Sequence, residues 1–201
     1  MTESSLRKQQ KTLTRDLIME ALVGLISDEG MGDFSVQSVA DRAGVSHRTV
    51  YRHYPSREAL LNALAEWLDE RMLERGGVMQ IDDESEFPEA IRRNFRLFEE
   101  MREMVDAYVV LCTATGARVE ARTRRTREIQ RLIRRTVAGH LSSKHAKAAG
   151  SLIRLISGST AWHQMRTEYS IDAASTSDAI AWAAGVLIRE LADGGGPSTD
   201  N

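Results

Sequence analysis

Seven consecutive residues, 47–53, combine side chains that are well suited to donating hydrogen bonds to nucleic acids. Arg48 and Arg52 carry guanidinium groups, and a guanidinium can donate two parallel hydrogen bonds to O6 and N7 of guanine. Thr49 and Tyr51 carry hydroxyl groups, which can donate to phosphate oxygens. The segment therefore has the chemistry to contact both the bases and the backbone of a nucleic acid.

Other kinds of site find less support in the sequence. The chain has five histidines, and none forms a set of three or four ligands with nearby cysteines or carboxylates. Cys112 is the only cysteine and lies in an apolar run, as a core thiol would. No glycine-rich phosphate loop and no nucleophile elbow occurs. We expect no metal site, no cofactor and no enzymatic activity.

The elements that must position residues 47–53 are two short helices joined by a tight turn. Ser35 caps the first predicted helix, Gly44 ends it, and Ser46 caps the second. Pro55 stops the second helix, because a proline disfavours helical geometry in the residue before it. This pattern is typical of a helix-turn-helix. The two helices are predicted over residues 36–43 and 47–54.

The sequence over residues 35–60 resembles the DNA-binding head of the TetR family of regulators. The most specific stretches are Ala43-Gly44-Val45-Ser46 and Thr49-Val50-Tyr51-Arg52-His53-Tyr54. The likeness covers about residues 12–62, and beyond them only the helical layout is similar. The resemblance implies a sequence-specific DNA-binding transcriptional regulator, usually a repressor, which a small-molecule effector releases from a palindromic operator in double-stranded DNA.

The resemblance also implies a role for each position of the head. Backbone phosphates are contacted by hydroxyl, imidazole and basic side chains, and base edges by side chains of the second helix. Arg48 stands where many members of the family have a small residue, so base contact and backbone contact both remain open for it. The expected phosphate contacts are Ser35, Ser46, Thr49, Tyr51, His53 and Arg57, and the expected base contacts are Gln37, His47, Arg48 and Arg52.

The rest of the chain predicts further helices and no strand, because apolar residues recur at helical spacing. The expected fold is all-α with about nine helices. We expect a helix-turn-helix domain at residues 1–55, a helical effector-binding and dimerisation domain at 56–192, and a disordered tail at 193–201. The remaining helices are predicted over residues 12–29, 56–75, 88–101, 102–113, 116–138, 143–167 and 176–192.

A set of aromatic and methionine side chains in the larger domain is the effector site that the resemblance implies. Plain hydrophobic core is the competing interpretation of the same residues. Polar contacts are available from Arg118, His163 or Gln164, and the eight arginines between residues 118 and 135 leave an anionic effector open beside an apolar one. The candidate residues are Phe95, Phe98, Met101, Met104, Tyr108, Leu111, Trp162 and Met165.

The last two predicted helices each carry small and large apolar residues on one face. The resemblance implies that these faces form a homodimer interface, and two-fold symmetry also suits a protein that binds two half-sites. The residues concerned are Gly150, Leu152, Ile153, Ile156, Ser157 and Thr160 on one helix, and Ile180, Ala183, Ala184, Leu187, Ile188 and Leu191 on the other.

The formal net charge of −2 does not exclude a DNA partner, because a site-specific protein needs only a local basic surface. The longest apolar run, Ala107 to Cys112, is too short to cross a membrane, and no secretory signal is recognisable. We therefore expect a cytoplasmic protein with no membrane partner. Two alternatives are a constitutive regulator with a filled core, and a helical small-molecule-binding or catalytic protein with a vestigial head.

Overall fold

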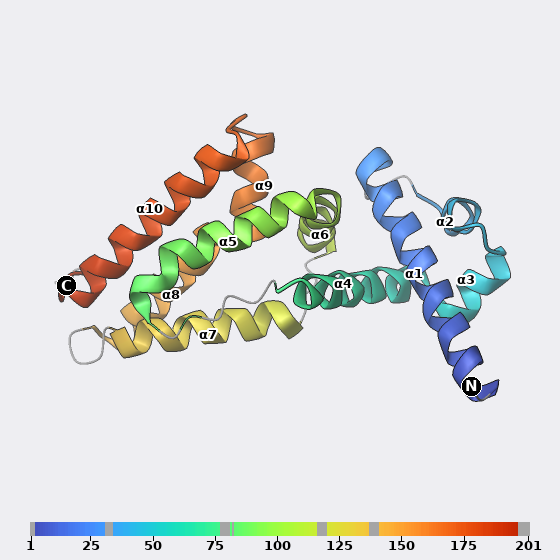
Figure 1. The fold of residues 1–201 in the computed structure, drawn as a ribbon, viewed down its shortest axis with the longest axis horizontal. Helices are drawn as coiled ribbons and strands as arrows, with labels where there is room; N and C mark the ends of the chain where they lie inside the picture. Colours follow the sequence, from blue (N-terminus) through green and yellow to red (C-terminus); the bar gives the residue numbers. More distant parts are fainter. Residues whose placement is uncertain are drawn as a thin grey trace. The chain divides into compact units, whose positions relative to one another are not determined.

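The computed structural model describes residues 3–30, 34–76, 81, 83–115, 120–136 and 141–196. Within these ranges the chain forms ten α-helices and one short 3-10 helix, and no strand (Figure 1). The predicted all-α fold class is confirmed. No helix of this described part is long and apolar enough to cross a membrane.

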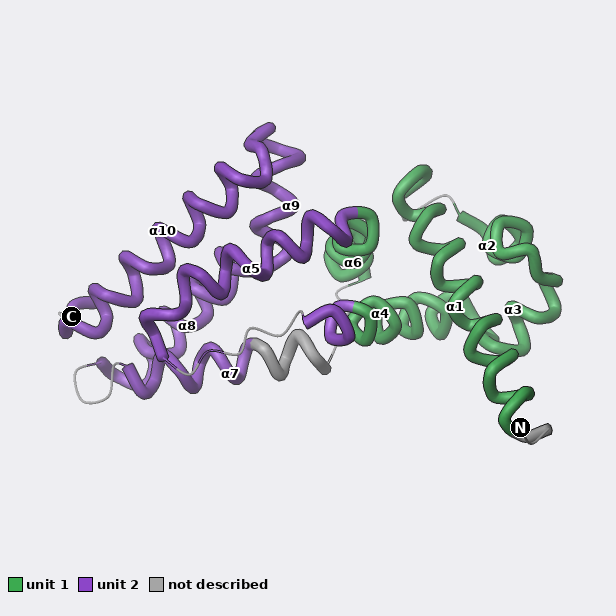
Figure 2. Tube along the Cα trace, in the orientation of Figure 1, with its two compact units in different colours: residues 1–71, 103–117 green, residues 72–102, 118–201 purple. Residues whose placement is uncertain are grey.

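The chain divides into two compact units, each of which is assembled from two segments (Figure 2). Unit 1 contains Met1–Arg71 and Glu103–Ala117, and unit 2 contains Met72–Arg102 and Arg118–Asn201. The functional division at residues 55 and 56 remains a prediction. Part of the tail expected to be disordered, residues 197–201, lies outside the described residues.

Unit 1 contains the helix-turn-helix. Its core forms where Ile18, Met19 and Leu22 of the first helix are buried together with Val39 and Val50 of the two short helices. The first helix begins nine residues earlier than Thr12, at Glu3. Residues 3–11 escaped prediction because they show no apolar periodicity. The helices that lie wholly or mostly in this unit are α1 Glu3–Glu29, α2 Val36–Ala43, α3 His47–His53, α4 Arg57–Glu74 and α6 Arg102–Thr115.

Unit 2 packs its helices closely at two glycines. A Cβ atom at Gly150 of the eighth helix would lie 3.4 Å from the Cα atom of Gln130, and one at Gly185 of the tenth would lie 3.0 Å from Cγ of Pro88. Pro88 lies in the first turn of the fifth helix, as predicted. The elements are η1 Glu84–Glu86, α5 Phe87–Glu100, α7 Glu120–Thr136, α8 Ser143–Ile156, α9 Ser159–Thr167 and α10 Ala173–Ala192.

The single helix predicted over residues 143–167 is wrong, because the chain breaks between α8 and α9. The Ser157 hydroxyl donates to the carbonyl oxygen of Ile153 at 2.7 Å and ends α8. Gly158 then takes an extended conformation, with φ −97° and ψ 168°, and precedes α9 as its N-cap. Both residues are buried. An apolar pattern that runs across such a break does not reveal it.

Candidate nucleic-acid interface

Two serine caps and one glycine set the ends of α2 and α3. The Ser35 hydroxyl oxygen accepts from the backbone N–H of Ser38 at 3.0 Å, and the Ser38 hydroxyl oxygen accepts from the N–H of Ser35 at 2.9 Å. Gly44 ends α2 in the left-handed region, with φ 65°. Ser46 then accepts from the N–H of Thr49 at 3.1 Å and begins α3. The predicted caps are confirmed.

One side of α3 is anchored in the core and the other is exposed. Val50 is completely buried, whereas His47, Arg48, Tyr51 and Arg52 are exposed. The rings of His47 and Tyr51 pack edge to face, with their centroids 4.6 Å apart. The outer side of α3 therefore presents an aromatic pair and two guanidinium groups.

Thr49 and Gln37 each form a side-chain hydrogen bond with a nearby residue, Ser46 and Asp41 respectively. The hydroxyl oxygens of Thr49 and Ser46 lie 2.8 Å apart, and donation by Ser46 leaves the Thr49 hydroxyl hydrogen for a phosphate oxygen. The Gln37 amide donates to Oδ1 of Asp41 at 2.7 Å. This bond uses one amide hydrogen, so the other hydrogen and the carbonyl oxygen of Gln37 are left to contact a base.

Arg57, in the first turn of α4, is positioned by an aromatic ring. Its guanidinium carbon lies 4.4 Å from the centroid of the Phe34 ring, and Phe34 itself is buried. A cation over an aromatic face is attracted by the ring's electron density. The sequence predicted a role for Arg57 from its positive charge, but it did not predict the contact with Phe34. The two residues are 23 positions apart, and no local pattern connects them.

The C-terminal end of α3 is held against α1. The phenol of Tyr54 is half-buried and hydrogen-bonded to Arg15, and burial raises the Tyr54 pKa against the opposing effect of that arginine. Arg15 in turn pairs with Glu70 of α4 at 2.9 Å. The preceding residue, His53, has its pKa lowered by burial and then by the positive charges of Arg52 and Lys11.

In unit 2, three of the expected effector-site residues form one aromatic cluster. Phe95 and Phe98 stack with their centroids 5.6 Å apart, and Trp162 meets Phe98 edge to face at 5.7 Å. Arg166 lies over the Trp162 ring at 4.3 Å, with its Nε 3.8 Å from Oε2 of Glu99. The buried indole N–H of Trp162 has no hydrogen-bond partner among the described residues.

The other candidates for the effector site are distributed over both units. Met101 is buried, and Met104, Met165 and His163 are half-buried. Tyr108 and Leu111 are buried in α6, which belongs to unit 1. Gln164 is exposed and donates to Glu168 at 3.3 Å. Among the arginines of the 118–135 stretch, those with described side chains are all exposed, namely Arg127, Arg131, Arg134 and Arg135, and Arg118 lies outside the described residues.

Helices α8 and α10 expose an apolar surface that differs from the predicted one. The expected faces are largely core, because Gly150, Ile153, Ser157, Ile180, Ala184, Ile188 and Leu191 are buried. A groove of about 520 Å³ lies between the helices, with Leu152, Leu187 and Glu190 in its lining. The large apolar side chains that the two helices expose are Leu152, Leu155, Trp182 and Val186.

Comparison with known proteins finds a likeness to a regulator family over a segment that contains the helix-turn-helix. The family model "Bacterial regulatory proteins, tetR family" matches residues 18–64. Nucleoid occlusion factor SlmA of Vibrio campbellii is 33% identical over 84 residues, which are 41% of this chain and 42% of that protein. The same factor of Marinobacter nauticus is 31% identical over 75 residues, or 37% and 38% of the two chains. The chain thus spans less than half the length of the curated relatives that it matches.

Solved structures extend the likeness to the whole fold. A TetR-like transcriptional regulator from Rhodococcus sp. RHA1 matches with a TM-score of 0.63 at 16% identity, over 90% of this chain and 96% of that one. A TetR family transcription regulator from Marinobacter aquaeolei VT8 matches with a TM-score of 0.64 at 18% identity, over 88% and 97%. A TetR variant from Acinetobacter baumannii AYE, in complex with minocycline, matches with a TM-score of 0.53 at 19% identity, over 87% and 93%. Because these identities are low, the solved structures show a similar fold and nothing more. Residues 18–64 are therefore similar to the N-terminal domain of the tetR family of bacterial regulatory proteins, and the fold is similar to that of TetR-like regulators.

Proposed function

We propose that this protein is a sequence-specific DNA-binding transcriptional regulator, with α3 as its recognition helix. The observation that carries the proposal is the division of α3 into a buried Val50 side and an exposed side with His47, Arg48, Tyr51 and Arg52. A helix of seven residues is too short to be stable alone, so its placement by the core is what makes it usable as a rigid element. Arg48 and Arg52 suit guanine edges, and Thr49 and Tyr51 suit the adjoining phosphates.

We further propose that the protein acts as a homodimer on a palindromic operator. The exposed apolar side chains of α8 and α10, with the groove between these helices, support a self-complementary interface. Two copies of α3 would then bind two half-sites, which gives an affinity that one short helix does not reach. The partner surface in this proposal is a second copy of Leu152, Leu155, Trp182 and Val186.

Repression and release by a small effector complete the proposal. The aromatic cluster of Phe95, Phe98 and Trp162, with Arg166 and Glu99 beside it, supports binding of an apolar molecule that carries a polar or charged group. The structural neighbour in complex with minocycline shows that a related fold accommodates a small molecule. An effector releases DNA only if it binds the two conformations of the regulator with different affinities.

A second candidate function follows from the relatives named as nucleoid occlusion factors. The match is 33% identical over 84 residues, so a chromosome-associated role is a specific alternative to regulation of a few promoters. Both functions need DNA binding, but they predict different distributions of sites along the chromosome.

Selection of bound fragments from a random DNA pool tests the proposal. We expect a two-fold symmetric site whose half-sites lie about one helical turn, or about 10 base pairs, apart. Crosslinking to chromosomal DNA in cells then separates the two candidates, because a regulator should occupy few promoters and an occlusion factor many dispersed sites. A protein that enriches no sequence and binds no duplex would instead be a small-molecule-binding helical protein with a vestigial head.

A further inference from the structure

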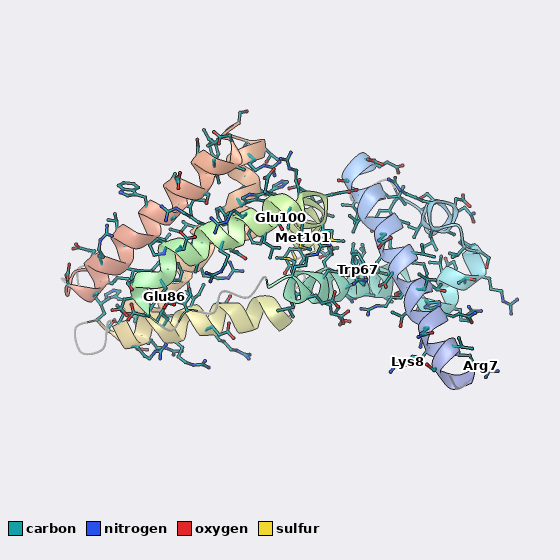
Figure 3. The ribbon with its side chains drawn as sticks, in the orientation of Figure 1. Arg7, Lys8, Trp67, Glu86, Glu100 and Met101 are labelled. Carbon is teal, nitrogen blue, oxygen red and sulfur yellow. The ribbon has the colours of Figure 1, made fainter. Side chains whose placement is uncertain are left out.

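Helix α1 begins well before the part that packs into the core of unit 1. The helix begins at Glu3, but Ile18 is its first buried residue, so about four turns precede the core. This end of α1 extends past α3 in Figure 1, and Arg7 and Lys8 are labelled on it in Figure 3. Apolar packing does not explain why the helix extends this far, because no residue described before Ile18 is buried.

The extension carries a basic stripe on one face. Residues 4–15 contain four basic side chains and no acidic one. Lys8, Lys11 and Arg15 follow the spacing i, i+3 and i+7, which aligns them along the helix over about 10 Å. The same face continues into the buried residues Ile18 and Leu22. The face that is apolar inside the core is therefore basic where the helix leaves it.

This stripe borders the C-terminal end of the recognition helix. Arg15 is hydrogen-bonded to Tyr54, the C-cap of α3, and Lys11 lies one turn further toward the free end of α1. The positive charge of Lys11 acts on His53 together with that of Arg52, and both lower the His53 pKa. Lys8 and Lys11 are exposed, so they add to the positive surface of α3 without being buried by it.

We propose that Lys8 and Lys11 form a second DNA-backbone contact, which holds phosphates beside the C-terminal end of α3. The inference rests on the proposed function, since it extends the surface that binds DNA. Ammonium groups on long flexible stems suit phosphates as point charges, and they carry no sequence information. The contact would strengthen binding to all sequences and leave recognition of bases to α3. An acidic protein partner is the competing occupant of the stripe.

The experiment measures the affinity of the full-length protein for two duplexes of equal length over a series of salt concentrations. One duplex carries the site recovered by selection and the other has random sequence. In the double variant Lys8→Ala/Lys11→Ala we expect weaker binding to both duplexes by the same factor. The slope of log affinity against log salt should fall by about 0.9 for each phosphate that the variant no longer neutralises, hence by nearly two for each protomer. The unfolding transition should not move, because both side chains are exposed.

Two matched variants complete the design. Lys8→Arg/Lys11→Arg keeps the charge and should keep the wild-type slope, and Lys144→Ala/Lys147→Ala removes two exposed lysines of α8 and should change nothing. A Lys8→Ala/Lys11→Ala protein with wild-type affinity and slope overturns the inference and favours a protein partner for the stripe. A loss confined to the selected site overturns it too, since the lysines would then contact bases. If the wild-type protein binds neither duplex, the proposed function fails first.

Discussion

The indole N–H of Trp67 in α4 donates a hydrogen bond of 2.7 Å to Oδ1 of Asp16 in α1. The other carboxylate oxygen of Asp16 lies 3.0 Å from a terminal nitrogen of Arg71, whose guanidinium lies over the Trp67 ring. Trp67 is only 1% exposed, so its N–H has no access to water. Figure 3 labels Trp67 on α4. The Asp16 carboxylate thus binds two side chains of α4, and together with the Arg15–Glu70 pair it joins α4 to the helix that carries the basic stripe.

We expect Asp16→Ala to lower the free energy of unfolding by about 1–3 kcal/mol, because it leaves a buried indole N–H without an acceptor. Asp16→Asn keeps an acceptor and should cost less. Asp28→Ala is the control, since Asp28 pairs with Arg42 at 2.6 Å between exposed side chains, and such pairs contribute about 0–1 kcal/mol. Denaturant unfolding of the three variants measures the difference. Equal losses in Asp16→Ala and Asp28→Ala would show that the Trp67 bond stabilises nothing.

Arg52 and Arg57 carry the same charge but should act differently. Arg52 is exposed on α3, the proposed recognition helix, so Arg52→Ala should cost about 1–3 kcal/mol on the selected site and relax the preference at one position of each half-site. Arg57 lies at the start of α4 over Phe34, so Arg57→Ala should weaken binding to all sequences and reduce the salt slope by about one for each phosphate left without its arginine. Titrations against single-base variants of the site over a range of salt distinguish the roles. The opposite pattern would mean that the two assignments are reversed.

The parts of this molecule that the sequence predicted are those that local signals determine. Ser35, Gly44 and Ser46 act on neighbours within three or four residues, so the helix ends that they set were predicted correctly. The Trp67–Asp16 bond joins residues 51 positions apart, and only the packing of α1 on α4 brings them together.

Two errors show why helical spacing alone is not enough. The start of α1 was placed too late because polar residues with good helix propensity leave no apolar pattern. The apolar faces of α8 and α10 were misassigned because each helix has apolar side chains on more than one side, and the choice of the buried side depends on α5 and α7. For the same reason, the sequence did not show whether Trp162 lines an effector site or belongs to the hydrophobic core.

Dimerisation should depend on the exposed apolar side chains of α8 and α10. Leu155 is 58% exposed, and Leu155→Glu should dissociate the dimer because a carboxylate would be buried without a partner. Leu13→Glu is matched to it, since Leu13 of α1 is 62% exposed, and it should leave the dimer intact. Sedimentation of both variants at micromolar concentration measures the result. A wild-type monomer at that concentration would contradict the proposed homodimer.

Effector binding should be sensitive to the indole of Trp162. Trp162→Phe removes the N–H that has no partner among the described residues but keeps an aromatic ring beside Phe98. We expect the stabilisation of the protein by an effector, measured as a shift in melting temperature, to fall in this variant. A discovered effector that stabilises Trp162→Phe as much as the wild type would place its site elsewhere.

DNA affinity should rise as the pH falls through the range in which His53 titrates. Burial, Arg52 and Lys11 hold the His53 pKa below the ordinary value of 6.5, so the free protein keeps this imidazole neutral at neutral pH. A phosphate beside it favours the charged form and raises that pKa, so binding takes up a proton. The sign for folding is opposite, because the unfolded chain binds the proton first and the folded state loses stability as the pH falls below 6.5.

His53→Gln should remove the pH dependence that His53 gives to DNA affinity and to folding stability. His47→Gln keeps His53 and should leave both of these pH dependences in place. Affinity and unfolding measured between about pH 5 and pH 8 test the two signs together. A DNA affinity that is independent of pH in the wild type would place His53 away from the phosphates.

The three tryptophans differ in burial, and this difference gives the molecule its own set of optical probes. Trp67 reports from unit 1 and Trp162 from unit 2, both shielded at 1% and 0% exposure, while Trp182 is 69% exposed on α10. Emission from Trp182 should therefore dominate the long-wavelength edge of the fluorescence spectrum and should be the part that acrylamide quenches. Any surface that covers α10 will shift and protect this one emitter and leave the other two unchanged, so association can be followed without a label.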